Sequence, residues 1–112
     1  DWKHYQDSEA RFSSEYGFVA SCSLPVWESV LTDFDWHHRS LAVRWHDKTL
    51  KGYETYLGYV RLHYPEFESL EDLVYYSQLN QRDALRFGVE HFRRTSYCRG
   101  SLIWQLNDCW PV

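Results

Sequence analysis

The chain has 112 residues, enough for one small domain, and 44% of them are apolar while 19% are aromatic. Such a composition excludes a disordered tail and favours a folded core. The formal net charge is −4 with scattered lysine and arginine residues, and no apolar run approaches the roughly 18 residues of a membrane helix. We therefore expect neither a nucleic-acid partner nor a membrane partner.

The first third of the chain predicts one strand and one short helix. Residues 1–10 have no period and are expected to form a loop, and Arg11 to Glu15 is short enough for a strand that Gly17 stops. Ser23 is a suitable N-cap and Pro25 suits the first turn of a helix. The apolar face of this helix is expected to comprise Val26, Trp27, Val30 and Leu31.

The middle of the chain predicts a loop followed by a helix. Residues 32–46 have no clean period and are expected to form a loop with one helical turn. Asp47 then suits the cap of a helix that runs to about Tyr64 and ends before Pro65. Apolar residues recur in it at helical spacing: Leu50, Tyr53, Leu57, Val60 and Tyr64.

The periodicity predicts the longest helix over Leu70 to Arg94. Gln78 and Gln81 fall on its apolar stripe, so we expect their amides to be buried and to need partners, for example backbone groups of a neighbouring loop. Three cysteines (Cys22, Cys98 and Cys109) occur without a Cys-x-x-Cys pair. They predict free, buried thiols rather than a disulfide framework.

A second strand is predicted at residues 101–106, Ser-Leu-Ile-Trp-Gln-Leu, which Asn107 and Asp108 close with turn chemistry. A continuous apolar run of this length is typical of a strand buried on both faces in a parallel sheet. The order of strand, several helices and strand predicts two parallel neighbours joined by a long, mostly helical crossover. The fold class is therefore α/β.

Two segments of this layout are candidates for chemistry. Glu15 stands at the C-terminal end of the first strand, and Trp104, Asn107 and Asp108 stand at the end of the second. Parallel strands open on the same side, so these residues would share one rim, where an indole beside a carboxylate suits a sugar ring. From position alone, Glu15 also fits a solvated strand end, and Trp104 fits a core residue followed by a simple turn.

A histidine-rich stretch invites a metal-site interpretation. It contains His37, His38 and His46 among Asp33, Asp35 and Asp47. The spacing matches no known ligand pattern, since there is no His-Glu-x-x-His and no cysteine partner. We therefore predict no metal site, and a solvated or substrate-side loop instead.

Two separated motifs, and the helical stretch between them, resemble one enzyme family. The segments RFSSEYGF and GSLIWQLNDCWPV, with LVYYSQLNQRDAL and VEHFRR between them, resemble glycoside hydrolase family 2 and in particular its β-mannosidase branch. The similarity extends from about Arg11 to Val112. It implies that residues 1–112 are part of a catalytic (β/α)₈ TIM barrel, holding its seventh and eighth strands.

The resemblance also implies roles for residues. Glu15 of Ser-Glu-Tyr-Gly would be the nucleophile that forms a covalent glycosyl-enzyme, hydrolysed with retention of configuration. Trp104 would wall the sugar pocket, and Tyr16, Asn107 and Asp108 are adjacent candidates for substrate binding. The expected substrate is a terminal β-D-mannoside or a related glycoside, and no metal or cofactor is implied.

The chain lacks two features of the family, the acid/base glutamate and the length of a whole barrel. The family's acid/base is a glutamate preceded by asparagine, and no Asn-Glu pair occurs here. A whole barrel takes about 250 residues, and the chain starts on Asp1 without a methionine, so we expect both ends to be cuts in a longer protein. The chain alone would need the missing N-terminal part of the barrel, and we expect it to be inactive and marginally stable.

Other functions remain open at this stage. A sibling activity of the same family is one, namely β-galactosidase, β-glucuronidase or exo-β-glucosaminidase. The Trp-Gln-Leu-Asn-Asp form favours a mannosidase or glucosaminidase over the other two. A carbohydrate-binding or interaction module without catalysis is another, favoured by the absence of a second catalytic carboxylate within the chain.

Overall fold

The structure is a computed structural model that describes residues 1–105 and 107–112. In chain order its elements are a 3-10 helix (Trp2–Asp7), β1 (Ser13–Tyr16), α1 (Leu24–Glu28), a 3-10 turn (Asp33–Asp35), α2 (Leu41–His46), α3 (Tyr53–Arg61), α4 (Leu70–Arg94) and β2 (Ser101–Ile103). These residues divide into two compact units. Residues 1–18 and 81–107 form the first unit, residues 19–80 and 108–112 form the second, and α4 passes through both.

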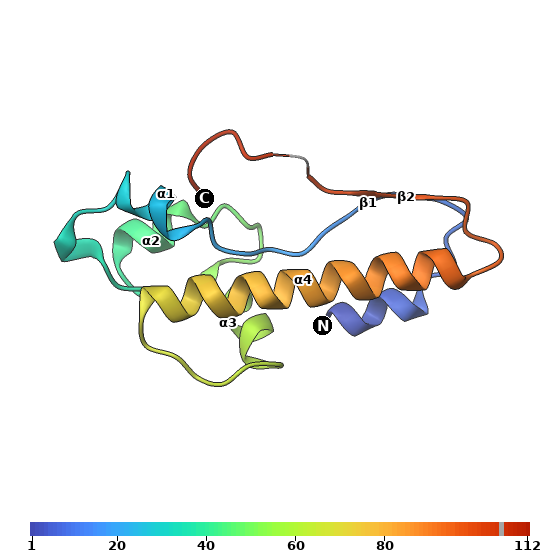
Figure 1. Ribbon diagram of the computed structural model, residues 1–112, viewed down its shortest axis with the longest axis horizontal. Helices are drawn as coiled ribbons and strands as arrows, with labels where there is room; N and C mark the ends of the chain where they lie inside the picture. The colour runs from blue at the N-terminus through green and yellow to red at the C-terminus, as the bar shows by residue number, and fades with distance from the viewer. Residues whose placement is uncertain (106) are drawn as a thin grey trace. The chain divides into compact units, whose positions relative to one another are not determined.

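The first unit contains a two-stranded parallel sheet. β1 pairs with β2, with Ser13 opposite Ser101 and Tyr16 opposite Ile103. The two strands lie side by side along the C-terminal half of α4 (Figure 1). Parallel pairing through a helical crossover, as the element order predicted, is thereby confirmed.

The core of the first unit lies between β1 and α4. Tyr16 is 8% exposed and its ring packs edge-on against Phe92, with centroids 5.1 Å apart. A side chain at Gly88 would come within 2.7 Å of the Tyr16 ring, so the helix approaches the strand closely only because glycine stands there. Ala84 is also fully buried in α4.

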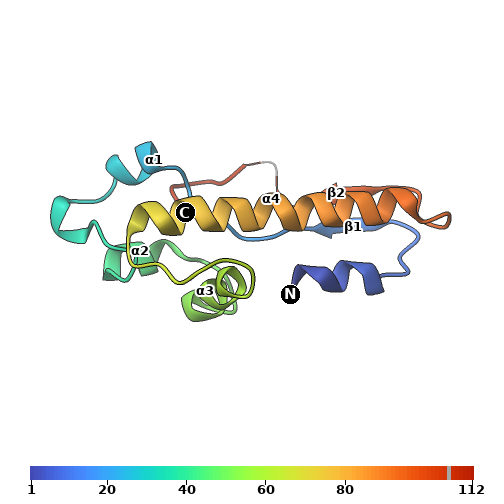
Figure 2. The ribbon, with the colours of Figure 1, turned by 60° about the horizontal axis from the view of Figure 1, so that its bottom comes forward.

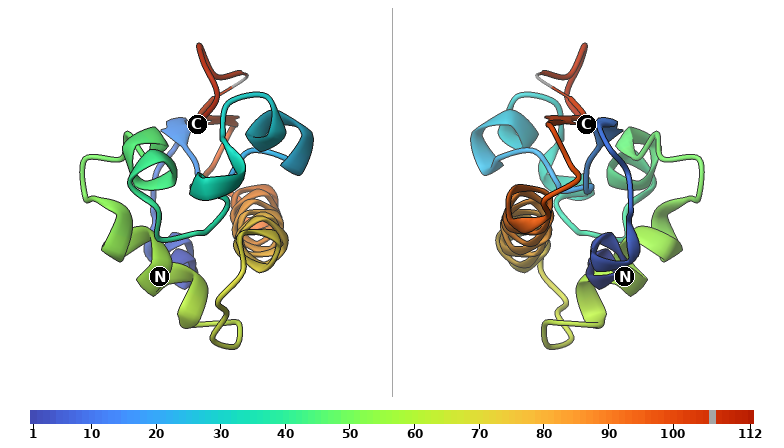
Figure 3. Two further views of the ribbon diagram at one scale, coloured as in Figure 1. Left: turned by 90° about the vertical axis from the view of Figure 1, so that its left-hand side faces the viewer. Right: turned by 90° about the vertical axis from the view of Figure 1, so that its right-hand side faces the viewer.

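The second unit is helical. α1, α2, α3 and the first half of α4 supply most of one apolar cluster. Figures 2 and 3 show these helices from further directions. Its fully or almost fully buried members include Trp27, Val43, Leu57, Val60, Leu70 and Leu73. The tryptophan of α1 is anchored by a hydrogen bond from its indole N–H to the Ser21 hydroxyl, at 2.8 Å.

The bounds predicted for α4 are confirmed. Ser69 caps its start, because the Ser69 hydroxyl accepts the Asp72 backbone N–H at 3.0 Å. Glu71 and Asp72 lie in its first turn, where the helix dipole favours negative charges. Arg93 and Arg94 lie in its last turn, where the dipole favours positive charges. None of the helices in the described residues is long and apolar enough to cross a lipid bilayer.

The partners predicted for the two glutamines of α4 are also confirmed. The Gln81 side-chain amide donates to the Phe18 carbonyl at 2.7 Å, and the Gln78 amide donates to the Ser21 carbonyl at 3.2 Å. The expectation that both amides are buried was wrong, since Gln78 is exposed and Gln81 is half-buried. Backbone carbonyls of the loop after β1 accept both amide N–H groups, but the loop does not bury the two side chains.

Several helix predictions were wrong in detail. Residues 2–7 form a 3-10 helix instead of a loop, because the Asp1 carboxylate accepts the Lys3 backbone N–H and caps it. Residues 41–46 form α2, which Ser40 caps. α3 begins at Tyr53, after Gly52 with a φ of 80°, a conformation that favours glycine. Leu50 is consequently fully exposed rather than part of the core.

The second strand differs from its prediction in length and burial. β2 ends at Ile103, Trp104 follows it outside the strand, and Leu106 lies outside the described residues. Leu102 and Ile103 are about half exposed, so burial on both faces was a wrong expectation for this chain. With only two strands, the sheet has no further neighbour within the described residues to cover these side chains.

The cysteine prediction holds in one respect. All three cysteines are free, as expected. Cys22 and Cys98 are half-buried and Cys109 is exposed, so the expected burial of all three was wrong.

Candidate functional site

The C-terminal ends of β1 and β2 bring two of the predicted site residues to one edge of the sheet. Glu15 is the third residue of β1, and Trp104 directly follows β2. The Trp104 backbone N–H donates to the Tyr16 carbonyl at 2.7 Å, which ties the end of β2 to the end of β1. Trp104 is 62% exposed, and Glu15 is exposed as well. This edge therefore presents a carboxylate and an indole to the surroundings.

Gly17 makes this edge possible. A Cβ atom at position 17 would collide with the Trp104 carbonyl oxygen, which is backbone and cannot rotate away. The turn after Glu15 thus passes over the Trp104 peptide at a distance that only glycine allows. The glycine of Ser-Glu-Tyr-Gly and the tryptophan of Trp-Gln-Leu-Asn-Asp are in direct contact.

Tyr16 points away from this exposed edge. Successive strand residues face opposite sides, and Glu15 is exposed whereas the Tyr16 ring is buried beneath α4. Its ring stands edge-on to Tyr5 with centroids 5.4 Å apart, and its hydroxyl is buried without a hydrogen-bond partner in the described residues. In this structure Tyr16 supports the strand from behind.

Tyr5 adds a second support to the same turn. Its hydroxyl donates to the Gly17 carbonyl at 2.6 Å. Burial and the neighbouring Tyr16 raise the pKa of Tyr5 to about 12. The hydroxyl therefore stays protonated at neutral pH and holds the backbone directly behind Glu15. Tyr5 was not singled out in the sequence, because residues 1–10 show no pattern that marks it.

Asn107 and Asp108 are both exposed. Asn107 belongs to the first unit with Glu15 and Trp104, whereas Asp108 belongs to the second. Within the second unit Asp108 lies near Cys22. Burial raises the pKa of the Cys22 thiol to about 11, and the Asp108 charge contributes to the rise. Cys22 is thus an unreactive thiol at neutral pH.

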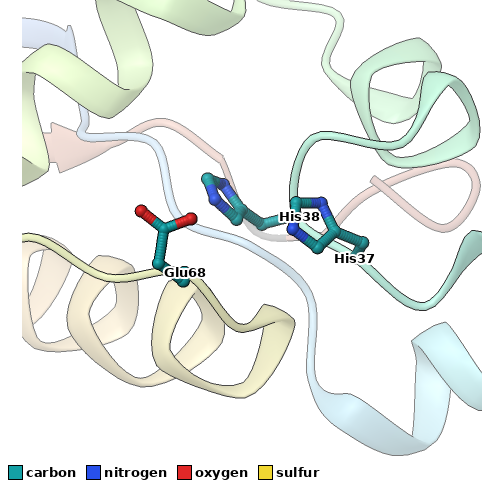
Figure 4. A group of neighbouring side chains, drawn as sticks. All are labelled: His37, His38 and Glu68. Carbon is teal, nitrogen blue, oxygen red and sulfur yellow. The ribbon is translucent and has the colours of Figure 1, made fainter.

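The three histidines of residues 37–46 separate into two places in the second unit. His46 stacks on Trp110 with ring centroids 4.5 Å apart, and its Nδ1 atom is hydrogen-bonded to the Pro111 carbonyl. His37 and His38 instead lie beside Glu68, from the segment that leads into α4 (Figure 4). One ligand atom from each of these three side chains lies within 4.8 Å of the others. Sequence spacing gave no sign of this cluster, because Glu68 stands in a different segment.

The aspartates near these histidines serve local turns. The Thr32 hydroxyl donates to Asp35 at 2.7 Å, and Asp47 accepts the Thr49 backbone N–H at 2.9 Å. Asp47 therefore follows α2 and fixes the next turn, rather than capping α3 as the sequence suggested. Neither aspartate belongs to the histidine cluster.

The amino-acid sequence of the chain is similar to those of β-mannosidases. The chain is 28% identical to the β-mannosidase of Bos taurus over 99% of its residues, and 34% identical to β-mannosidase B of Aspergillus niger over 91%. It covers 14% and 13% of those two proteins. The chain thus spans about one seventh of the length of the curated relatives it matches. No family model matches the chain.

A solved structure matches the chain more fully. The crystal structure of the β-D-mannosidase from Dictyoglomus thermophilum superposes on all of it with a TM-score of 0.93 and 33% sequence identity, using 14% of that protein. The resemblance to β-mannosidases that the motifs predicted is confirmed by these matches. The chain is a β-mannosidase-like segment, a mixed helix and strand unit that corresponds to one part of a larger structure.

Proposed function

We propose that this chain is the part of a β-mannosidase-like glycoside hydrolase that carries the catalytic nucleophile, Glu15. The observation that supports this proposal is the shared edge of the two parallel strands, where Glu15, the third residue of β1, and Trp104, which directly follows β2, are both exposed. In the proposed reaction the Glu15 carboxylate attacks the anomeric carbon of a terminal β-D-mannoside and the glycosidic bond breaks. Water then hydrolyses the covalent glycosyl-enzyme with retention of configuration.

The proposed roles of the other residues follow from their positions. Trp104 would line the sugar pocket with its exposed indole, and Asn107 would supply amide hydrogen bonds to sugar hydroxyls. Asp108 is the adjacent candidate for the same purpose. For Tyr16 the burial of its ring favours a supporting role for the strand over direct sugar contact.

The proposal includes a larger architecture. We infer that β1 and β2 are the seventh and eighth strands of a (β/α)₈ barrel of which residues 1–112 are a part. Two observations support this: the parallel pairing across a helical crossover, and the half-exposed side chains of Leu102 and Ile103, which a barrel interior and further strands would cover. The acid/base carboxylate would lie on an earlier strand outside the chain, about 5–5.5 Å from Glu15.

Kinetics of a nucleophile variant test this proposal. In the full-length protein that contains this chain, Glu15→Gln keeps the shape of the side chain but cannot form a stable glycosyl ester. We expect kcat on nitrophenyl β-mannoside to fall by on the order of 10³-fold or more. Glu9→Gln, an exposed glutamate of the same unit, is the matched control and should retain normal turnover. Turnover by Glu15→Gln close to that of the control would refute the assignment.

A further inference from the structure

The cluster of His37, His38 and Glu68 has the composition of a metal site and plays no part in the proposed glycosidase chemistry. Imidazole nitrogens and a carboxylate oxygen are the donors that zinc binds in proteins. The three side chains come from two segments, the loop before α2 and the loop before α4, and converge in Figure 4. Nothing in the spacing of the sequence required this convergence.

The His38 side chain provides independent evidence for a ligand within this cluster. Its side chain is fully buried, and neither of its ring nitrogens has a hydrogen-bond partner in the described structure. Buried polar groups are almost always satisfied, and an unsatisfied one costs roughly 1–3 kcal/mol. Phe67 packs edge-on against the ring with centroids 5.3 Å apart, so apolar contact fixes the imidazole without satisfying it.

Charged groups of both signs act on the place where the three side chains converge. Arg39 and Arg61 repel a cation there, and the Glu68 carboxylate offsets part of that repulsion.

The distances require a modest adjustment. Zinc–ligand bonds are about 2.0–2.2 Å long, so donor atoms on one tetrahedral ion lie about 3.4 Å apart. The observed separations reach up to 4.8 Å. His37 and Glu68 are exposed, so their side chains have room to rotate inward toward the buried His38. Rotation of His37 breaks one exposed hydrogen bond, which its Nδ1 atom accepts from the Arg39 backbone N–H at 3.0 Å.

We propose that His37, His38 and Glu68 form a binding site for one zinc ion, which ties the loop before α2 to the segment before α4. Three protein ligands leave one tetrahedral position for a water molecule or a fourth group. The ion would satisfy one nitrogen of the buried His38 imidazole. Its role would be structural, since it clips together two loops that border the apolar cluster of the second unit.

Zinc binding to the full-length protein tests the site. Equilibrium dialysis of the metal-stripped protein against Zn²⁺ should show saturable uptake that His37→Ala and Glu68→Gln each weaken by about tenfold or more. Replacing zinc by Co²⁺ should give the visible absorption of a tetrahedral ion, and both variants should lose it. Both substituted residues are exposed, so the variants are expected to fold.

Matched controls separate this site from general surface binding. His4→Ala removes an exposed histidine of the other unit, and Glu28→Gln removes an exposed glutamate of the same unit as the cluster but outside it; both should bind zinc as the unsubstituted protein does. Equal zinc uptake by all four variants, or no saturable uptake by the unsubstituted protein, would overturn the proposal. Neither result would bear on the role of Glu15, which turnover measures separately.

Discussion

At the scale of single residues, the contact between Gly17 and the Trp104 peptide determines the shape of the candidate site. The Trp104 N–H binds the Tyr16 carbonyl, and the Trp104 carbonyl fills the space where a side chain of residue 17 would stand. Two sequence motifs far apart in the chain are therefore coupled through backbone atoms. This coupling explains why glycine stands at position 17.

Gly17→Ala should lower the free energy of unfolding of the full-length protein by about 1–3 kcal/mol, because strand ends must separate to admit the methyl group. Urea denaturation measures the change. Gly58→Ala is the control: it lies inside α3 with nothing within 4 Å of its added Cβ, and should stabilise by roughly 0.5–1 kcal/mol. A Gly17→Ala protein as stable as Gly58→Ala would contradict the close contact.

For single residues, the sequence motifs predicted more of the candidate site than the apolar periodicity did. The resemblance of the Ser-Glu-Tyr-Gly and Trp-Gln-Leu-Asn-Asp segments to β-mannosidases is confirmed, whereas the catalytic role of Glu15 and the sugar contact of Trp104 stay predictions. Tyr5 and Glu68 could not be singled out in advance. Each matters only through a partner distant in sequence, Gly17 for Tyr5 and the two histidines for Glu68.

At the scale of elements, the caps decide where the helices begin. Ser40 accepts the Val43 backbone N–H at 3.2 Å and starts α2 within a stretch that the residue pattern alone assigned mainly to a loop. Ser23 occupies the same position before α1, but its side chain makes no capping hydrogen bond. The two serines thus form a natural pair for measuring what the cap contributes.

Ser40→Ala should destabilise the protein by about 1 kcal/mol, because the α2 N-terminus loses an acceptor that the alanine cannot replace. The shift in the midpoint of urea unfolding measures this loss. Ser23→Ala should shift the midpoint by less, since no capping bond is lost there. A larger effect at Ser23 than at Ser40 would show that the caps do not act as described.

Long elements could be predicted from the sequence and short ones could not. The 25 residues of α4 carry many turns of one apolar stripe, so its bounds at Leu70 and Arg94 were predicted correctly. The cap of α3 was predicted five residues too early, at Asp47 rather than Gly52, because an aspartate before Leu50 imitates a cap. The short 3-10 helix at Trp2–Asp7 rests on one aspartate hydrogen bond and has no period to detect.

At the scale of the whole molecule, the exposed apolar residues of β2 are the main departure from the expected burial. Leu102 and Ile103 of β2, and Trp104 directly after it, are each about half exposed or more, and the sheet has two strands within the described residues. An apolar run of this kind is typical of a strand with neighbours on both sides. Its exposure agrees with a chain that spans about one seventh of its curated relatives.

The chain of residues 1–112 expressed alone should therefore be inactive and prone to aggregate. Within the described residues the outer edge of each of the two strands is unpaired, and the sequence contains no Asn-Glu pair. The first step of the proposed reaction would therefore lack its proton donor, and the second step would lack the base that activates water. Assay of the purified chain on nitrophenyl β-mannoside, with its solubility followed by light scattering, measures both properties. Turnover by the isolated chain that is lost on Glu15→Gln would contradict this expectation.

Trapping the covalent intermediate tests whether Glu15 is the nucleophile of a retaining β-mannosidase. A 2-deoxy-2-fluoro-β-mannosyl fluoride has a reactive leaving group, while its 2-fluoro substituent slows hydrolysis of the glycosyl-enzyme, which then accumulates. Mass spectrometry of the digested full-length protein should find one fluoromannosyl group, esterified to Glu15, and none in Glu15→Gln. A sugar attached to any other residue, or labelling that persists in Glu15→Gln, would contradict the account.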